Sequence, residues 1–137
     1  MAGAKNTNYT KQQINGILRE IKTLVKADRW TLSKKYPERK KNIDFEINYC
    51  INKKLYTGII NDLCAENFCY SIKNDNPNYP DDDLYIFSIQ KELMNFQGDF
   101  EDIEIYIKGY ITASNDGNNV IFISFHELEE SIFFLFQ

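Results

Sequence analysis

Apolar residues in the first part of the chain recur with the period of a helix. Residues 1–9 are polar and are expected to form a frayed terminus. Thr10-Lys11-Gln12-Gln13 then fits a capping box, in which a threonine hydroxyl and a glutamine amide satisfy free backbone groups. The apolar positions that follow are spaced by three and four residues, at Ile14, Ile17, Leu18, Ile21, Leu24 and Val25. This pattern predicts an amphipathic helix with one stripe facing the core.

Two shorter helices are expected after an extended link at 29–35. Pro37 suits the first turn of the second helix, and its inner face is expected to carry Ile43, Ile47, Cys50 and Ile51. The third helix is expected over about 57–64, with Thr57 as its cap and with Ile59, Ile60 and Leu63 inward. Residues 65–72 are expected to add one more turn.

The period changes to two after a loop at 73–83 that is rich in Asn, Asp and Pro. One strand is expected at 84–90, followed by a long connection over 91–102. Two further strands are expected on either side of an Asp-Gly turn near Asp116. Helices first and strands after predict an α+β fold, with N-terminal helices packed on one face of a small twisted antiparallel sheet. The length of 137 residues suits a single domain over 1–137.

The last two strands send alternate side chains to opposite faces. One face is expected to carry Ile103, Ile105, Ile107, Ile121, Ile123 and Phe125. The other is expected to carry Glu104, Tyr106, Lys108, Tyr110, Val120, Phe122, Ser124 and His126. A turn centred on Asp116 places Tyr106 opposite His126 and Lys108 opposite Ser124, with Cβ atoms about 4.5–5.5 Å apart.

Tyr106, Lys108 and His126 together suit cleavage of an RNA phosphodiester. The imidazole can act as general acid or base near neutral pH, and the ammonium can balance the charge that grows on the phosphate. The phenol can donate a proton or position a base. This chemistry needs no metal and no cofactor. The alternative is that the three are ordinary polar residues of a solvated strand face.

Charge is distributed unevenly along the chain. Residues 1–60 hold 13 Lys or Arg and 5 Asp or Glu, whereas residues 61–137 hold 3 and 15, for a net charge of −4. The basic half could contact RNA phosphates, and the candidate RNA-binding residues are Lys34, Lys35, Arg39, Lys40, Lys41 and Lys73. Alternatively, the two halves attract each other within the fold or solvate their surfaces.

The cysteines and the hydropathy of the chain indicate which kinds of site and which cellular location to expect. Cys50, Cys64 and Cys69 form no CxxC pair, which favours buried free thiols over a metal or redox site. No apolar stretch approaches the roughly 20 residues of a membrane span, and the start, MAGAKNTNYT, lacks the apolar segment of a secretory signal. The expected location is the cytoplasm.

Four segments stand in an order and spacing that resemble one known family. They are DFEINYCINKKLYTGIINDL followed by Glu66-Asn67-Phe68, then NDNPNYPDDDLYIF, then IEIYIKGYI, and finally VIFISFHE. The stretch from about Trp30 to Glu129 thereby resembles the MqsR-type toxins of bacterial type II toxin–antitoxin modules.

This resemblance implies a RelE-like fold and an endoribonuclease that cuts single-stranded messenger RNA without a metal until a cognate antitoxin neutralises it. By position, Tyr106, Lys108 and His126 match functional residues of the family. The chain departs from the family at Cys69-Tyr70, where some members carry a functional Lys. It also departs near Ile86-Phe87, where they carry a Gln. Lys73 and Gln90 are nearby candidates to replace them.

A second hypothesis from a different class is a non-catalytic binding protein on the same scaffold, such as a degenerate toxin or an inhibitor carried by a mobile element. The acidic second half and the apolar tail at 128–137 suit such a role. The tail could cover the core, pair at a sheet edge or form a homo-oligomer contact.

Overall fold

The computed structural model describes residues 4–74 and 82–137. In chain order the elements are α1 (Lys11–Lys26), β1 (Trp30–Leu32), α2 (Lys40–Asn48), α3 (Lys53–Asn61), a short 3-10 helix η1 (Ala65–Asn67), β2 (Phe68–Lys73), β3 (Asp83–Met94), β4 (Phe100–Ser114) and β5 (Gly117–Glu127). The strands lie in the order β1-β5-β4-β3-β2. The predicted α+β class with helices on a sheet is confirmed. The sheet is mixed rather than wholly antiparallel, because β1 pairs parallel to β5.

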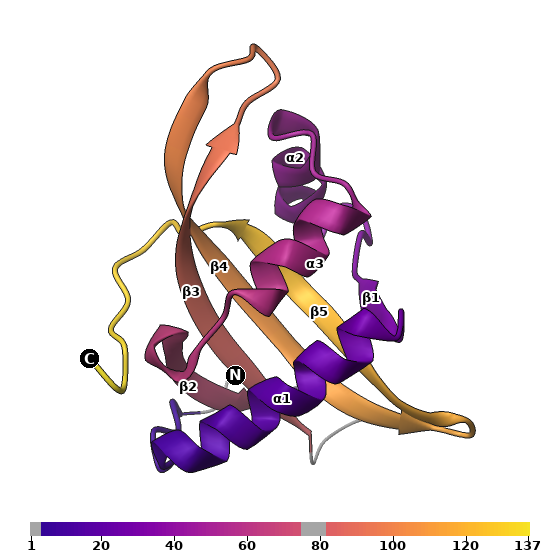
Figure 1. Cartoon of the computed structure of the whole chain (residues 1–137), viewed down its shortest axis with the longest axis vertical. Coiled ribbons are helices and arrows are strands. Elements are labelled where there is room, and N and C mark those ends of the chain that lie inside the picture. Colours follow the sequence, from indigo (N-terminus) through magenta and orange to yellow (C-terminus); the bar gives the residue numbers. More distant parts are fainter. Residues whose placement is uncertain (1–3, 75–81) are drawn as a thin grey trace.

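Helices α1 and α3 lie across one face of the sheet (Figure 1). The predicted capping box of α1 is confirmed, because the backbone N–H of Gln13 donates to the Thr10 hydroxyl at 3.1 Å and the Gln13 amide oxygen accepts from the backbone of Thr10 at 2.8 Å. Its buried residues are Ile14, Leu18, Ile21 and Val25. No helix within 4–74 or 82–137 combines the length and apolar character that crossing a membrane requires.

The predicted inner face of the second helix is confirmed only in part. Ile51 is buried, although it lies beyond the end of α2, and Ile43 is half-buried. Helix α2 turns Asn42 and Phe45 inward, whereas Ile47 is 63% exposed, so the prediction is wrong for Ile47. Cys50 is exposed and follows the helix in the left-handed backbone region, with φ of 50°. The buried Asn42 makes hydrogen bonds that are described below, which explains why an apolar pattern could not locate this face.

The third helix begins earlier than expected. Asn52 caps α3 by accepting from the backbone N–H of Leu55 at 2.9 Å, and the Thr57 hydroxyl donates instead to the carbonyl of Lys53. Inward residues of the predicted helix are confirmed as buried, namely Ile59, Ile60 and, just beyond the helix end, Leu63.

Strands replace two segments that the sequence assigned otherwise. The expected turn over 65–72 is only η1, after which β2 begins at Phe68. The expected long connection over 91–102 is wrong, because β3 continues to Met94 and β4 begins at Phe100, so that the two form a long hairpin (Figure 1). Residues 1–3 of the expected terminus and 75–81 of the expected loop lie outside the described residues.

A bulge in β5 decides which side chains face the helices. Pairing runs from Ser114 with Gly117 to Gly109 with Phe122, and then shifts by one residue so that Lys108 pairs with Ser124. Ile123 is the additional residue in this irregularity. Consequently Val120, Phe122 and Phe125 all belong to the core. The expected placing of Val120 and Phe122 on the face of His126 is therefore wrong.

Gly109 lies opposite the bulge and leaves no space for a side chain. A Cβ atom there would stand 2.9 Å from both the Ile121 carbonyl oxygen and the Phe122 ring. The close approach of β5 therefore requires glycine at this position.

Candidate active site

A pocket of about 370 Å³ lies on the sheet face that α1 and α3 leave uncovered. Tyr106 and Lys108 of β4 line it, and they alternate with the core residues Ile105 and Ile107. The other lining groups come from four places: β5, α2 with the residues that lead into it, the N-terminal segment with β2, and the tail after β5. In that order they are Ile123, Ser124 and His126; Glu38, Arg39, Lys41 and Asn42; Lys5 and Tyr70; and Leu128 to Ile132.

The predicted cluster is brought together in this pocket. Tyr106 pairs with His126, and Lys108 pairs with Ser124, as the sequence predicts. The Tyr106 and His126 rings are tilted by 33° with centroids 5.5 Å apart. The turn is centred between Asn115 and Asp116 and not on Asp116 as predicted. The pairs still agree with the predicted register, because the bulge adds one residue to β5 between the turn and Ser124.

Asn42 of α2 holds the irregular part of β5 in place. Its side-chain amide donates to the carbonyls of Ser33 and Ile123 at 2.9 and 3.1 Å, and its oxygen accepts from the backbone N–H of Phe125 at 2.9 Å. Strand β1 pairs with β5 only as far as Phe122, so the backbone of β5 after Phe122 has no strand partner on that side. The Asn42 side chain supplies hydrogen bonds there in place of a strand. Asn42 thereby fixes the backbone from which Ser124 and His126 project.

The environment of His126 favours its neutral form. Burial lowers the pKa of the imidazole from its usual value, and the nearby Lys41 and Lys108 lower it further. A hydrogen bond at 2.9 Å between Nδ1 and the carbonyl oxygen of Glu127, together with the Glu129 carboxylate, acts in the opposite direction. When Nδ1 carries the proton for this hydrogen bond, Nε2 is the ring nitrogen that can accept one.

Tyr106 is held in its protonated form. Burial is the largest cause that raises its pKa to about 12, followed by the neighbouring Tyr70 and Cys69. The phenols of Tyr70 and Tyr106 influence each other's pKa, and burial also raises the pKa of Tyr70. Sequence reasoning did not select Tyr70. The available signal was its position, where some members of the family that the sequence resembles carry a Lys.

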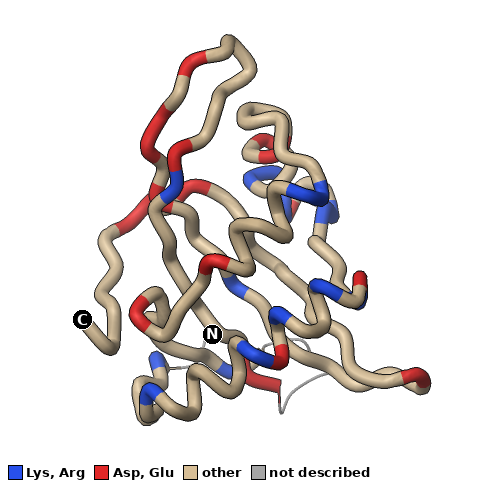
Figure 2. The backbone as a smooth tube through the Cα atoms, viewed as in Figure 1, with Lys and Arg blue, Asp and Glu red and all other residues tan. Residues whose placement is uncertain are grey.

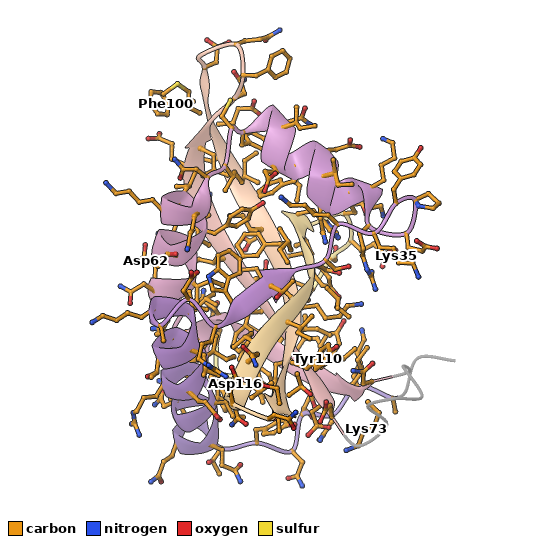
Figure 3. All side chains as sticks on the ribbon, turned by 90° about the vertical axis from the view of Figure 1, so that its right-hand side faces the viewer. Lys35, Asp62, Lys73, Phe100, Tyr110 and Asp116 are labelled. Carbon is orange, nitrogen blue, oxygen red and sulfur yellow. The ribbon has the colours of Figure 1, made fainter. Side chains whose placement is uncertain are left out.

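Only two of the six predicted RNA-binding residues line the pocket, namely Arg39 and Lys41. Lys34, Lys40 and Lys73 form salt bridges elsewhere with Glu46, Asp44 and Asp83. Figure 3 shows Lys73 at the lower end of the molecule, far from Lys35. The pocket therefore brings together Arg39 and Lys41 of the six, and it does not include the other four.

Several ion pairs join the basic first half of the chain to the acidic second half. They are Lys11–Glu66, Arg29–Asp116 and Lys41–Glu129. Acidic residues also lie along the β3–β4 hairpin and at the start of the tail (Figure 2). The alternative interpretation of the charge asymmetry, attraction between the two halves, thus accounts for part of it.

The tail at 128–137 covers the sheet and one side of the pocket. The backbone N–H of Leu128 donates to the carbonyl of Glu104 at 2.8 Å, and that of Leu135 donates to Phe68 at 3.0 Å. Leu135 and Phe136 pack against the core, while Phe133 stacks on Tyr70 and is 51% exposed. Of the three roles considered for the tail, the structure shows core covering.

The residues in 4–74 and 82–137 contain no group of three or more His, Cys, Asp or Glu side chains arranged to hold a metal ion. Cys69 is buried, and this burial raises the pKa of its thiol to about 12. Cys50 and Cys64 are exposed free thiols, so the prediction of burial is wrong for these two.

Comparisons of the chain with protein-family models, with curated proteins and with solved structures find no match. The pocket combines an imidazole that favours its neutral form, a phenol that keeps its proton and several cationic side chains. Such a set can remove one proton, supply another and attract a phosphate.

Proposed function

We propose that the protein is an endoribonuclease toxin of the MqsR type, with a RelE-like fold, that cleaves single-stranded messenger RNA in the cytoplasm without a metal. A cognate antitoxin would neutralise it. The observation that carries the proposal is the joint presence of Tyr106, Lys108 and His126 in one pocket on the open sheet face. The cationic residues Arg39 and Lys41, which line the same pocket, support binding of an anionic chain.

The proposed reaction is attack of the ribose 2′-oxygen on the adjacent phosphorus. His126 accepts the proton of the 2′-hydroxyl through its neutral imidazole. Lys108 stabilises the negative charge that grows on the non-bridging phosphate oxygens. Tyr106 donates its proton to the departing 5′-oxygen as the bond from phosphorus to that oxygen breaks. Each well-placed acid or base contributes about 10²–10⁴-fold to the rate.

The direct test is cleavage of a single-stranded RNA by the purified protein in EDTA. We expect His126→Ala and Lys108→Ala each to reduce kcat/KM by at least about 10²-fold, while the free energy of unfolding falls by less than about 1 kcal/mol. Lys26→Ala is the matched control, because Lys26 is exposed and ends α1 away from the pocket. Wild-type protein that is free of bound antitoxin and leaves RNA intact would contradict the proposal.

A protein-binding role is the second candidate, and the β3–β4 hairpin favours it. Met94, Phe96 and Phe100 are exposed near its tip, and Phe96 and Phe100 are 66% and 64% accessible. Exposed apolar groups of this kind are common at contact surfaces between proteins. This hypothesis predicts normal bacterial growth after strong expression, whereas the ribonuclease hypothesis predicts growth arrest that His126→Ala relieves.

A further inference from the structure

Lys5 enters the pocket from a segment that is remote in sequence from the other pocket residues. It lines the pocket beside Tyr70, and its ammonium stands 4.8 Å from the centroid of the Tyr70 ring. A cation over an aromatic face is attracted by the ring but keeps its full charge. The salt bridges within 4–74 and 82–137 do not include Lys5, whereas Lys41, which also lines the pocket, is paired with Glu129.

The backbone around Lys5 is held in place rather than frayed as the sequence suggests. Asn6 forms an isolated antiparallel bridge with Ser71 of β2, with backbone hydrogen bonds of 2.8 and 3.0 Å. The Tyr9 hydroxyl is 2.7 Å from Oγ of Ser71, and the Tyr9 ring packs edge-on against Phe68. These contacts attach the segment to β2 immediately beside Tyr70.

We propose that Lys5 contacts a phosphate of the bound RNA, and that the Tyr70 ring and the Asn6–Ser71 bridge position it to do so. This inference rests on the proposed function. Lys5 stands over Tyr70 of the edge strand β2, whereas Lys41 belongs to α2, which is hydrogen-bonded to β5 through Asn42. The strand order β5-β4-β3-β2 places β4, with Tyr106 and Lys108, between these two sides of the pocket. A single strand whose reacting phosphate lies at these three residues would carry a neighbouring phosphate past Lys5. The pocket thus gains a cation from a segment outside the sheet.

The test measures binding of a short single-stranded DNA oligonucleotide, which lacks the attacking 2′-hydroxyl and stays intact. For each phosphate contact that is lost, the slope of log K against log salt concentration falls by about 0.7. We expect Lys5→Met to lower the slope by about this amount and to weaken binding about fivefold at low salt. Lys26→Met, an equal charge change on an exposed lysine outside the pocket, should leave the slope unchanged. On RNA, Lys5→Met should raise KM with little change in kcat.

A double-mutant cycle tests the positioning by Tyr70. Tyr70→Phe keeps the ring beneath the ammonium, so the effect of Lys5→Met should remain in that background. Tyr70→Leu removes the ring, so Lys5→Met should then change the slope less. An equal slope for wild type, Lys5→Met and Lys26→Met would overturn the inference while the proposed function stands. A wild type that neither binds the oligonucleotide nor cleaves RNA would overturn both.

Discussion

The two faces of the sheet use adjacent residues of β5 for opposite purposes. Phe125 is completely buried under the helices. The centroid of its ring lies 5.0 Å from that of Tyr56 and 6.0 Å from that of Phe122. Its neighbour His126 projects into the pocket on the other face, beside Tyr106 and Lys108. One face is therefore filled by apolar packing, and the other collects titratable groups. We expect substitutions on the first face to change stability and those on the second to change activity.

The largest effect should come from Phe125→Ala. Removing a buried phenyl ring loses its transfer energy and leaves a cavity, so we expect the free energy of unfolding to fall by about 3–5 kcal/mol. Small domains have only about 5–15 kcal/mol in total. Urea unfolding followed by circular dichroism measures the change. The neighbouring His126→Ala should cost less than about 1 kcal/mol, and an equal cost at both positions would contradict the separation of the two faces.

An intermediate effect is expected from Asn42→Ala, which couples the faces. The change leaves the backbone N–H of Phe125 and the carbonyl of Ile123 without their partner. We expect a loss of about 2–3 kcal/mol in the free energy of unfolding. The rate of RNA cleavage should also fall, because the backbone that carries His126 is released.

Asn48→Ala is the matched control for that substitution, because Asn48 is the exposed last residue of the same helix. Unfolding by urea and kcat/KM under identical conditions separate the two effects. If Asn42→Ala lowers stability but leaves kcat/KM unchanged, Asn42 supports the core only, and the two faces are independent of each other.

The difference between the faces also explains which elements could be predicted from the sequence. Helix α1 carries its own cap and an unbroken apolar stripe, so local pattern suffices to locate it. Helix α2 turns the polar Asn42 inward because the backbone of β5 needs its hydrogen bonds, and this tertiary demand is invisible in the apolar pattern. The bulge at Ile123 also reverses the expected faces of Val120 and Phe122, and strand alternation does not reveal it.

The candidate site was predictable where it is local. Tyr106, Lys108 and His126 belong to one hairpin, so alternation and register bring them together over a short stretch of chain. Lys5 and Tyr70 reach the pocket through the Asn6–Ser71 bridge and through β2, and the tail reaches it by crossing the sheet. Such contacts between distant segments depend on the assembled core and leave no periodic signal.

The smallest effect should be the dependence of stability on pH that His126 contributes. Burial lowers the pKa of this imidazole in the folded protein below its usual value of 6.5. The unfolded chain therefore binds the proton more readily, so protonation favours unfolding. The contribution is absent above about pH 6.5, and the loss of stability grows as the pH falls towards the pKa of the folded state.

Urea unfolding of wild type and His126→Gln at about pH 7.5 and about pH 5 isolates this contribution, because other groups titrate alike in both proteins. We expect wild type to lose more stability on acidification than the variant. The pKa of His126 depends on two opposing sets of causes: burial, Lys41 and Lys108 favour the neutral imidazole, whereas the Glu127 carbonyl and Glu129 favour the charged form. If wild type loses less than the variant, the carboxylate of the tail prevails. The folded protein would then favour the charged imidazole, which suits a general acid, so the proton transfers assigned to the open face would have to be exchanged.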